Sequence, residues 1–503
     1  MKQYFLGIDN GGTLSKAAIF DDKGTQISSA SIAMSMITPH EGYTERDMDE
    51  LFYSTTLMIK KAINESQIDP AQIKAVACTG HGKGLYAWGK DNTPNGNGII
   101  STDTRAYMYP DLWNKDGTSD KVFEKTYQKI LACQPVSLLR WMKEHDRSQY
   151  DSIKYVFEVK DYIRFRLTGV AMAEQTDMSG TNLMNLSTKQ YDDELLNLFG
   201  IPEIKDALPP IASSSDPCGY ITKEAAELTG LKIGTVVAGG MFDIDASAIA
   251  MDITNEDHIA LIAGTWSINE YISKSPILDK SVMMNSLYCL DDYYLIEESS
   301  PTSASNHAWF IKNFLEAESQ IAKHNGVHPY AYCDNLAQNI GPDEQHIIFL
   351  PFLYGSNYNP QAKASLIGLS SHHTKGHIVR SILEGIVFTH MIHLDKLLAH
   401  RSHTKSIRLA GGVTASPLWT QLFADIIQIP VEVVQTGELG ALGAAMSAAV
   451  ACNYYPSLSV ASKEMSRVQT LIEPQTAHGS IYKEKYKQYV EVVNALDPLW
   501  SKI

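Results

Sequence analysis

The sequence lacks the cysteine patterns of a disulfide-bonded or zinc-binding protein. Its six cysteines lie far apart, and no two of them form a CxxC pair. Secreted disulfide frameworks and structural zinc sites both need cysteines in recurrent, closely spaced patterns. We therefore expect reduced thiols and a cytoplasmic location.

Long apolar runs are also missing. The apolar run near the N-terminus, Tyr4 to Ile8, has only five residues before Asp9 interrupts it. A signal peptide needs an apolar core of about 7–15 residues, and a membrane-spanning helix needs about 20. The sequence therefore predicts neither export nor a membrane partner.

A third absence is a block of basic residues. The 42 Lys and Arg residues are outnumbered by 57 Asp and Glu, which gives a formal charge of −15. Proteins whose main partner is a nucleic acid cluster Lys and Arg against the phosphates. We exclude a nucleic-acid partner, and we expect any anionic ligand to be held by local positive groups.

The overall composition is that of an ordinary globular protein, and the chain is long enough for more than one domain. The 503 residues are 44% hydrophobic and 20% charged, which is typical of folded domains. At about 150 residues per domain, this length predicts two to four domains.

Short apolar segments followed by glycine-rich turns organise the first half. Phe5–Ile8 and Ala17–Phe20 read as two strands of a hairpin around residues 9–13. Ile73–Cys78 reads as a buried strand that ends in the loop 79–84, and Lys154–Val159 as another. Functional loops are therefore expected at strand ends.

The second half repeats this opening pattern. Thr235–Ala238 is an expected strand before residues 239–243, and Ile259–Ala263 leads into residues 264–267. A small-residue turn after a buried strand, present once in each half, indicates two similar α/β domains. Ser406–Ala410 is a further expected strand.

Three helices are expected from periodicity and caps. One begins at Thr44, with Thr44 and Asp47 as a capping pair. Another follows Ser416 as N-cap and Pro417 at the first helical position, and it runs to Ile427. The third, Gly440–Val450, is rich in small residues and should pack closely against a neighbour.

Two turns have the composition of phosphate-binding sites. The backbone N–H groups of residues 11–13 and 264–266 are predicted to form anion-binding turns that face each other across an interdomain cleft. No GxxxxGK[ST] sequence is present, so a Walker-type site is excluded. The alternative for each turn alone is a hairpin or bulge glycine.

Asp9 and Asp243 each stand at the end of an apolar strand. A carboxylate there is desolvated unless a cation or hydrogen-bond donors compensate. A magnesium ion or a substrate hydroxyl would do so. The alternative is an aspartate that caps a helix or a turn.

The ordered set of motifs resembles the FGGY carbohydrate kinases along almost the whole chain. Within that family the sequence resembles the L-xylulose and 3-keto-L-gulonate kinase branch, through TGHGKGL, STDTRA and LPFLYGSN. The stretches that carry the family resemblance are GIDNGGT (7–13), ERD (45–47), TGHGKG (79–84), STDTRA (101–106), PVSLLRWMKEH (135–145), KDYIRFRLTG (160–169), TDMSGT (176–181), GGMFDIDA (239–246), AGTWS (263–267), LPFLYGSNYNP (350–360), LAGGVTASPLW (409–419) and GELGALGAA (437–445).

The resemblance implies an α/β protein of two ribonuclease-H-like domains of the actin and hexokinase type, with a cleft between them. We expect residues 1–247 to form the N-terminal domain, with the sugar site and the first phosphate turn. Residues 248–503 are expected to form the C-terminal, ATP-binding domain. The implied reaction moves the γ-phosphoryl group of ATP to a sugar hydroxyl, and a homodimer is compatible with the relatives.

Site residues follow from the same resemblance. Asp243 would be the general base, and Asp9 would hold magnesium, through water. Lys16 is expected near phosphate, with a solvated strand lysine as the alternative. The residues expected to bind the nucleotide are Gly11, Gly12, Thr13, Lys16, Gly264, Thr265, Trp266, Gly411 and Gly412; the last two form a turn where a Cβ would obstruct adenine.

The sugar side departs from the related D-xylulose kinases. Their loop carries Gln-Met-His where this chain has residues 81–83, His-Gly-Lys. Lys83, with Arg46 and Arg105, is predicted to hold a carboxylate such as that of a keto-gulonate. The alternative is that Lys83 is solvated or paired with Asp103.

Several acidic residues are expected to accept hydrogen bonds from sugar hydroxyls. Helix capping is the competing role of Asp47. The complete set of residues expected to bind the sugar is Glu45, Arg46, Asp47, His81, Lys83, Asp103, Arg105, Asp161 and Asp243.

Two histidine groups, residues 372–377 and the pair His390 and His393, have no convincing further ligands. We interpret the first as a solvated loop and the second as a partly buried helix face. Competing functions are a D-xylulose kinase, a gluconate kinase and, from another class, a non-catalytic sugar sensor.

Overall fold

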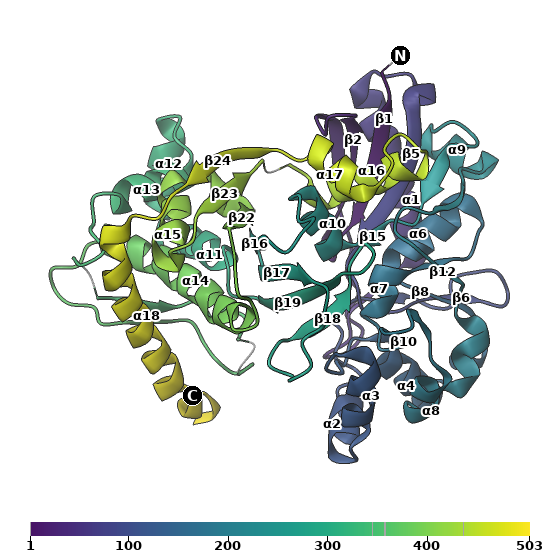
Figure 1. Cartoon of the computed structure of the whole chain (residues 1–503), viewed down its shortest axis with the longest axis horizontal. Helices are drawn as coiled ribbons and strands as arrows, with labels where there is room; N and C mark the ends of the chain where they lie inside the picture. Colours follow the sequence, from purple (N-terminus) through teal and green to yellow (C-terminus); the bar gives the residue numbers. More distant parts are fainter. Residues whose placement is uncertain (1, 345, 357–358, 436, 503) are drawn as a thin grey trace. The chain divides into compact units, whose positions relative to one another are not determined.

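A computed structural model describes residues 2–344, 346–356, 359–435 and 437–502. The chain forms two compact units, each built from separated segments (Figure 1). The first unit contains Met1–Thr254, Ile272–Leu295 and Gly437–Ser466, and the second contains Asn255–Tyr271, Ile296–Thr436 and Arg467–Ile503. The expected division of the sequence after residue 247 stays a prediction.

A seven-stranded mixed sheet forms the centre of the first unit. β1 pairs antiparallel with β2 and parallel with β5, which confirms the predicted hairpin and the strand at residues 73–78. The apolar runs of these strands are buried, as the alternation of strand and turn predicted. The order is β13 (Pro217–Tyr220), β14 (Val236–Ala238), β5 (Ile73–Gly80), β1 (Tyr4–Asn10), β2 (Leu14–Asp21) and β3 (Gln26–Ala33), with β15 (Met241–Phe242) also paired to β5.

Helices complete the core on this sheet. The first helix, α1, begins at Met48 rather than at the predicted Thr44, because Asp47 itself is the N-cap and its carboxylate accepts from Glu50 N. The strand predicted at residues 154–159 ends at Phe157, because Glu158 already begins the next helix as its N-cap. The helices are α1 (Met48–Ser66), α6 (Val159–Thr168), α9 (Lys223–Thr229), α10 (Asp243–Ala250), α16 (Leu439–Ala451) and α17 (Leu458–Met465).

A second apolar core in this unit lies among shorter elements. Its largest buried side chains include Trp113, Tyr109 and Phe199, which pack as one aromatic group. The elements are β4 (Glu45–Arg46), β6 (Tyr86–Gly89), β7 (Gly98–Ile99), α2 (Met108–Lys115), α3 (Thr118–Thr126), α4 (Pro135–His145), α5 (Arg147–Asp151), β8 (Ile153–Phe157), β9 (Ala173–Glu174), α7 (Gln175–Ser179), β10 (Met184–Asn185), β11 (Gln190–Tyr191), α8 (Asp193–Leu198) and β12 (Ile211–Ala212).

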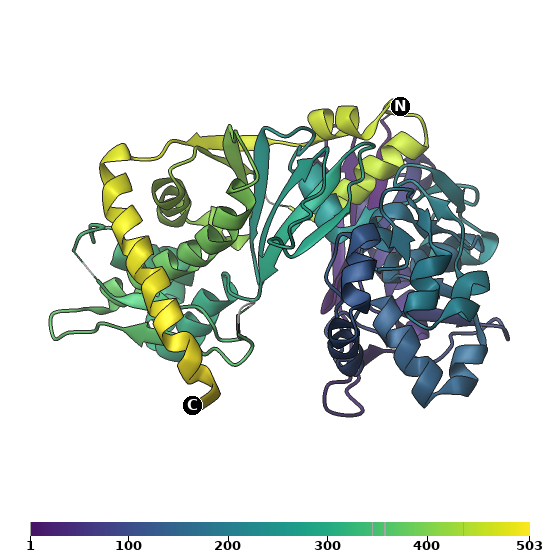
Figure 2. The same cartoon turned by 60° about the horizontal axis from the view of Figure 1, so that its bottom comes forward.

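Helix α16 lies against β1 and α10 of the first unit, although it comes from the last fifth of the chain; Figure 2 shows the yellow-green helix beside the purple strands. A Cβ at Gly7 of β1 would lie 1.8 Å from Ala441 O, and a Cβ at Gly443 would lie 2.1 Å from Ala246 O. Only glycine permits such close backbone approach. The predicted close packing of this small-residue helix is confirmed.

The second unit repeats the strand arrangement of the first. β16 pairs antiparallel with β17 and parallel with β22, as β1 does with β2 and β5. β23 then adds in parallel and β24 antiparallel, as β14 and β13 do in the first unit. The seven-stranded sheet that contains these strands also includes β18, from the segment Ile272–Leu295. Its order is β18 (Met284–Leu287), β19 (Tyr294–Ser300), β17 (Ser267–Ser273), β16 (His258–Ala263), β22 (Ser406–Ala410), β23 (Val431–Val434) and β24 (Val468–Ile472).

Helices α14, α15 and α18 pack on one another in the second unit (Figure 1). α15 has Ser416 as N-cap and ends at Ile427, as predicted. The motif at residues 350–360 includes 357 and 358, which lie outside the described residues. The remaining elements are α11 (Ser305–Phe314), α12 (Glu316–His324), α13 (Pro329–Ala337), β20 (Ile348–Leu350), β21 (Ser365–Ile367), α14 (Lys375–Leu398), α15 (Pro417–Ile427) and α18 (Thr476–Leu496).

Two negative findings apply to the described residues. None of their helices is both long enough and apolar enough to cross a membrane. All six cysteines are free thiols.

Candidate active site

Three parallel strands of the first unit end at the same edge of the sheet. Asp9 of β1 is opposite Thr79 of β5, and Phe242 of β15 is opposite Gly80. Asp9, the loop that begins at His81, and Asp243 therefore lie at neighbouring strand ends. The carboxyl ends of parallel strands are where open α/β sheets bind ligands.

Asp9 is a largely buried carboxylate with one cation beside it. Burial raises its pKa from 3.8 to about 6, while Lys16 lowers the pKa and Glu438 raises it. Lys16 faces Asp9 across the β1–β2 hairpin, and its Nζ lies 2.6 Å from Glu438 Oε2. A Cβ at Gly440 would lie 2.6 Å from Asp9 Oδ2, so the first turn of α16 lies directly against this carboxylate.

Asp243 is the first residue of α10 and is half-buried. The strand before it is fixed on one side by Thr79, whose hydroxyl donates to Met241 O over 2.7 Å. Two residues further on, Asp245 is fully buried and accepts from Cys289 N over 3.0 Å. Burial raises the pKa of Asp245 well above 3.8, which leaves Asp243 as the solvent-accessible carboxylate of this helix start.

Arg46 holds the turn at residues 11–13, which the sequence predicted to bind phosphate, through its carbonyl oxygens. Its guanidinium donates to Gly11 O over 3.3 Å and to Gly12 O, and the side chain is buried. Gly11 and Gly12 are half-buried, and Thr13 is exposed. Arg46 was expected to bind the sugar, and that role stays a prediction; its hydrogen bonds in the structure are to the carbonyl oxygens of this turn.

The loop after β5 places His81 and Lys83 beside β15. His81 Nε2 lies 2.9 Å from Tyr86 Oη, and burial, with the nearby charge of Arg46, lowers the pKa of His81 to about 3. The ring is therefore neutral at physiological pH. Lys83 has a φ of 66°, and its Nζ lies 5.7 Å from the centroid of the Phe242 ring.

Glu45, Asp103 and Arg105 form a clamp with one another. Arg105 Nη2 lies 2.6 Å from Glu45 Oε1 and 2.8 Å from Asp103 Oδ2, and its guanidinium stacks 4.1 Å from the Tyr43 ring centroid. Asp103 also accepts from Thr44 N over 2.7 Å. The charge of Arg105 is thus already matched by two carboxylates, in a clamp that joins the segments around residues 45 and 103.

Two other expected sugar ligands have structural partners. Asp47 caps α1, as the competing interpretation held. Asp161 is fully buried, with Lys160 Nζ at 2.8 Å and Arg164 Nη1 at 2.9 Å. Asp47 is exposed and Asp161 is buried, and the role of each in sugar binding stays a prediction.

The second turn, residues 264–266, joins β16 to β17 in the other unit and leaves Thr265 and Trp266 exposed. A buried histidine supports it. His390 Nδ1 lies 3.0 Å from Ser267 Oγ and 2.7 Å from Asn269 Oδ1, while Nε2 lies 3.2 Å from Ser303 Oγ. Burial lowers the pKa of His390 to about 3, so this network joins β17 to the start of α11 without adding charge.

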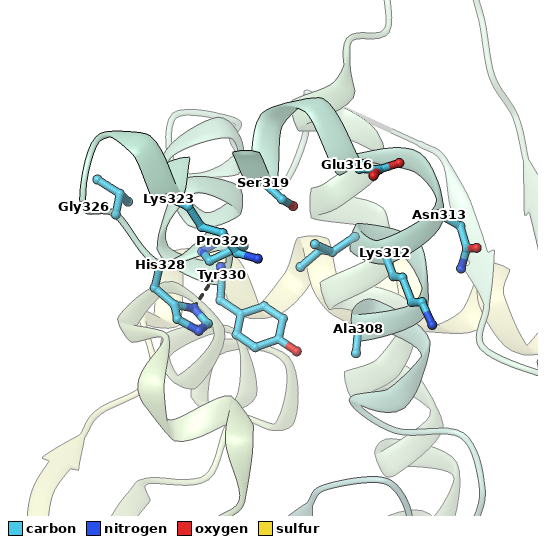
Figure 3. Close-up of a pocket in the computed structure, with 12 residues that line it drawn as sticks. Ala308, Lys312, Asn313, Glu316, Ser319, Lys323, Gly326, His328, Pro329 and Tyr330 are labelled. Carbon is cyan, nitrogen blue, oxygen red and sulfur yellow. Dashed lines mark hydrogen bonds between the residues drawn. The ribbon is translucent and has the colours of Figure 1, made fainter. Parts of the chain in front are cut away.

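One pocket adjoins the turn at Gly411 and Gly412, and a second pocket shares a lining residue with the first. The smaller, of about 60 Å³, is lined by Gly412 and by His307, Tyr330, Asp334 and Trp419. The larger, of about 900 Å³, lies among α11, α12 and the start of α13 and shares Tyr330 (Figure 3). Its labelled polar side chains include Lys312 and Lys323.

Three glycines at these turns are not required by the fold. A Cβ at Gly12, Gly264 or Gly412 would meet no atom within 4 Å, and none of the three has a positive φ. Every other described glycine with this much open space has a φ between +70° and +82°. The space in front of these three turns is therefore open to a ligand.

The histidine groups have local explanations. His377 completes a capping box with Thr374 at the start of α14. His393 is buried and pairs with Glu298 over 3.0 Å. Among the described residues, no group of three or more His, Cys, Asp or Glu side chains is placed to hold a metal.

Comparison with known proteins decides the family. The N-terminal domain model of the FGGY family of carbohydrate kinases matches residues 4–250, and the C-terminal domain model matches residues 259–452. The chain belongs to the FGGY family of carbohydrate kinases. It is an ATP-dependent carbohydrate kinase with the two-domain α/β fold of that family.

Similar proteins cover the kinase from end to end. It is 35% identical to the L-xylulose/3-keto-L-gulonate kinase of Escherichia coli strain K12, over 100% of this chain and 99% of that protein. It is also 35% identical to a probable L-xylulose kinase of Pasteurella multocida strain Pm70, over 98% and 99%. Crystal structures of the xylulose kinase and gluconate kinase of Lactobacillus acidophilus match with TM-scores of 0.90 and 0.89, each at 25% identity, over 99% and 100% of both chains respectively.

Sequence reasoning missed several residues that this geometry brings into the site. Glu438 and Gly440 lie in the motif GELGALGAA, which carried the family resemblance, but neither was assigned a role in the site. The spacing of Gly440 and Gly443 was a usable signal, because a helix start that excludes side chains has a neighbour close by. Thr176 lies in the motif TDMSGT and His390 in a noted histidine pair, but neither was given a role in the site, because their partners are more than 60 residues away.

Proposed function

We propose that this kinase transfers the γ-phosphoryl group of ATP to a hydroxyl of L-xylulose, or of a related keto-sugar or keto-acid such as 3-keto-L-gulonate. The similarity to proteins named for these substrates supports the substrate class. The observation that carries nucleotide binding is the open space at Gly12, Gly264 and Gly412. All three are positions at which the sequence predicted contact with ATP.

Asp243 is proposed as the general base. It stands half-buried at the start of α10, at the strand edge where His81 also lies. The phosphoryl-transfer transition state is loose, so positioning and charge stabilisation matter more than base strength. A carboxylate within hydrogen-bond reach of the sugar hydroxyl is sufficient to accept its proton.

Asp9 is the proposed magnesium ligand. Mg²⁺ in kinases is bound by one or two carboxylates, waters and substrate phosphates, not by a cage of side chains. A buried carboxylate whose pKa is raised to about 6 and which lies near Glu438 fits that role, because a cation would offset the cost of its burial. The bound ion would neutralise charge on the β- and γ-phosphates.

Backbone amides are proposed to hold the phosphates, with Gly11, Gly12 and Thr13 on one unit and Gly264, Thr265 and Trp266 on the other. The support from Arg46 beneath the first turn favours this role, since fixed donors cost little reorganisation during reaction. Gly411 and Gly412, with the pockets at Tyr330, are the proposed nucleobase side.

Lys83 is the proposed determinant of acidic substrates. Arg46 and Arg105, its two expected companions, are engaged by turn carbonyls and by carboxylates respectively. Lys83 has no ion pair within the described residues, and its ammonium lies near Phe242, the neighbour of Asp243. It is therefore the cation best placed to meet a substrate carboxylate.

Substrate assays test this function. ADP release is measured with L-xylulose, 3-keto-L-gulonate, D-xylulose, L-ribulose, gluconate and glycerol. We expect turnover with the first two and its loss in Asp243→Asn, with ATP still bound. Preference for D-xylulose or gluconate would establish the alternative kinases, and sugar binding without ADP release would establish a sensor.

The role of Lys83 is tested by Lys83→Met. The rate on 3-keto-L-gulonate should fall about tenfold or more relative to the rate on L-xylulose, since only the former has a carboxylate. Equal rates before and after the substitution would remove Lys83 from substrate recognition. A cytoplasmic location and a homodimer stay part of the proposal; the free thiols support the former.

A further inference from the structure

The backbone just before Asp243 is held by a hydroxyl from another helix. Phe242 N donates to Thr176 Oγ1 over 2.9 Å. Thr176 lies in α7 and is fully buried. Phe242 is the residue that precedes α10, and its side chain supplies no cap. The contact therefore fixes the main chain from which Asp243 extends.

Glu174 sets the direction of that hydroxyl. Thr176 Oγ1 donates to Glu174 Oε2 over 2.8 Å. A hydroxyl has one proton and two lone pairs. When the proton points to the carboxylate, a lone pair is left for the Phe242 N–H.

Both carboxylate oxygens of Glu174 accept hydrogen bonds. Oε1 accepts from Thr176 N over 3.0 Å and from Ser214 Oγ over 2.7 Å, and Lys160 Nζ lies 3.3 Å from Oε2. A carboxylate only accepts, whereas a glutamine would turn its NH₂ group toward one of these donors. The site is thus built for a carboxylate and not for its isosteric amide.

The strand β15 is held from its other side as well. Thr79 of β5 donates its hydroxyl to Met241 O over 2.7 Å. The peptide group between Met241 and Phe242 is therefore held at both its C=O and its N–H, by two buried threonines on different elements. A rotation of this peptide group would break at least one of the two hydrogen bonds.

We infer that Glu174 is a positioning residue for phosphoryl transfer, acting through the Thr176 hydroxyl to hold Asp243 in reach of the acceptor hydroxyl. The inference rests on the proposed role of Asp243 as general base. A base works at about 2.6–3.2 Å from the proton it accepts. A displacement of about 1 Å costs about a hundredfold in rate.

The decisive variants are Thr176→Val and Thr176→Ser. Valine keeps the shape but removes the hydroxyl, and kcat should fall about 10- to 100-fold while KM for sugar and for ATP changes less than about threefold. Serine should restore kcat to within about threefold. Thr176→Ala is assayed in the same way, so that a Val variant that folds poorly does not decide the result.

Thr229→Val is the matched control. Thr229 is also buried at a helix end, and its hydroxyl also donates to one group, Ala225 O, and accepts from a backbone N–H, that of Leu231. It should lower the melting temperature by a similar amount and leave kcat within about threefold. Equal losses of kcat in Thr176→Val and Thr229→Val would overturn the inference.

A double-substitution experiment separates this inference from the proposed function. In the Asp243→Asn background, Thr176→Val and Glu174→Gln should each change the residual rate less than about threefold, because there is no base left to position. Additive losses would overturn the inference alone. Full turnover by Asp243→Asn would instead overturn the assignment of the base, whatever Thr176 does.

Discussion

Lys16 and Glu438 form an ion pair at the carboxyl end of β1, with Nζ and Oε2 2.6 Å apart, although the two residues come from opposite ends of the chain. The pair lies beside Asp9, and its two members act on that carboxylate in opposite directions. Lys16 lowers the pKa of Asp9, and Glu438 raises it. Burial raises the pKa of Asp9 most, and the two members of the pair then adjust it in opposite directions.

Substitutions at the pair should move the pH profile in opposite directions. The acid limb of kcat/KM for ATP reports the free enzyme. In Lys16→Met this limb should move to higher pH, because the cation that favours ionised Asp9 is gone. In Glu438→Gln it should move to lower pH. Shifts in the same direction in both variants would contradict the control of Asp9 by this pair.

Asp9→Asn should stabilise the protein without ligand while abolishing magnesium-dependent turnover. The folded pKa of Asp9, about 6, lies above its ordinary value of 3.8, so its contribution to stability is present below about pH 4 and is lost as pH rises through 6. The free energy of unfolding of Asp9→Asn should therefore rise relative to that of the wild type between pH 5 and 7.5, by on the order of 1–2 kcal/mol. Denaturant titrations of both proteins across this pH range measure the difference in stability. A difference that shrinks toward pH 7.5 would refute the prediction.

Alanine at Gly12, Gly264 or Gly412 should spare the fold and impair nucleotide binding. No protein atom opposes a Cβ at these positions, so melting temperatures should stay within about 2 °C. KM for ATP should rise about tenfold, or about 1.4 kcal/mol. Gly443→Ala is the contrasting variant, because its Cβ would meet Ala246 O at 2.1 Å and should prevent normal folding. Unchanged KM for ATP in all three would remove the proposed contacts.

Arg46→Lys should raise KM for ATP and leave KM for the sugar unchanged. A lysine has a single ammonium and cannot span the carbonyl oxygens of Gly11 and Gly12 as the guanidinium does. The first phosphate turn would loosen, and we expect about a tenfold rise for ATP. A rise confined to the sugar would instead support the role predicted from the sequence, a direct contact with substrate.

The fold could be predicted from the sequence where local signals agreed. The strands at residues 73–78, 259–263 and 406–410 were evident because apolar runs ended in glycine or small polar turns. The start of α1 was misplaced by four residues, because Thr44 and Asp47 both have capping chemistry and only the folded chain shows that Thr44 N binds Asp103. The duplicated strand order of the two units was indicated only by a short repeated pattern of strand and turn.

The sequence indicated which residues are candidates for the site better than it indicated which residues they contact. Asp9 and Asp243 were identified because each follows an apolar strand, and a charge in such a place needs an explanation. The clamp of Glu45 and Arg105 could not be predicted, since the residues are sixty positions apart and either would also suit a sugar. The hydrogen bonds of Arg46 could not be predicted for the same reason: its charge suggested an anionic ligand, and in the structure it donates to the carbonyl oxygens of Gly11 and Gly12. Its role in sugar binding stays a prediction.

The position of α16 has a consequence for how the chain is made. The sheet surface at Gly7 and the start of α10 are covered by residues synthesised near the end of translation. While the second unit is being synthesised, the first unit is therefore incomplete. Its exposed apolar face can then bind chaperones or aggregate. A premature stop before residue 437 would leave the first unit without α16, so we expect that this unit cannot be released as an independent module.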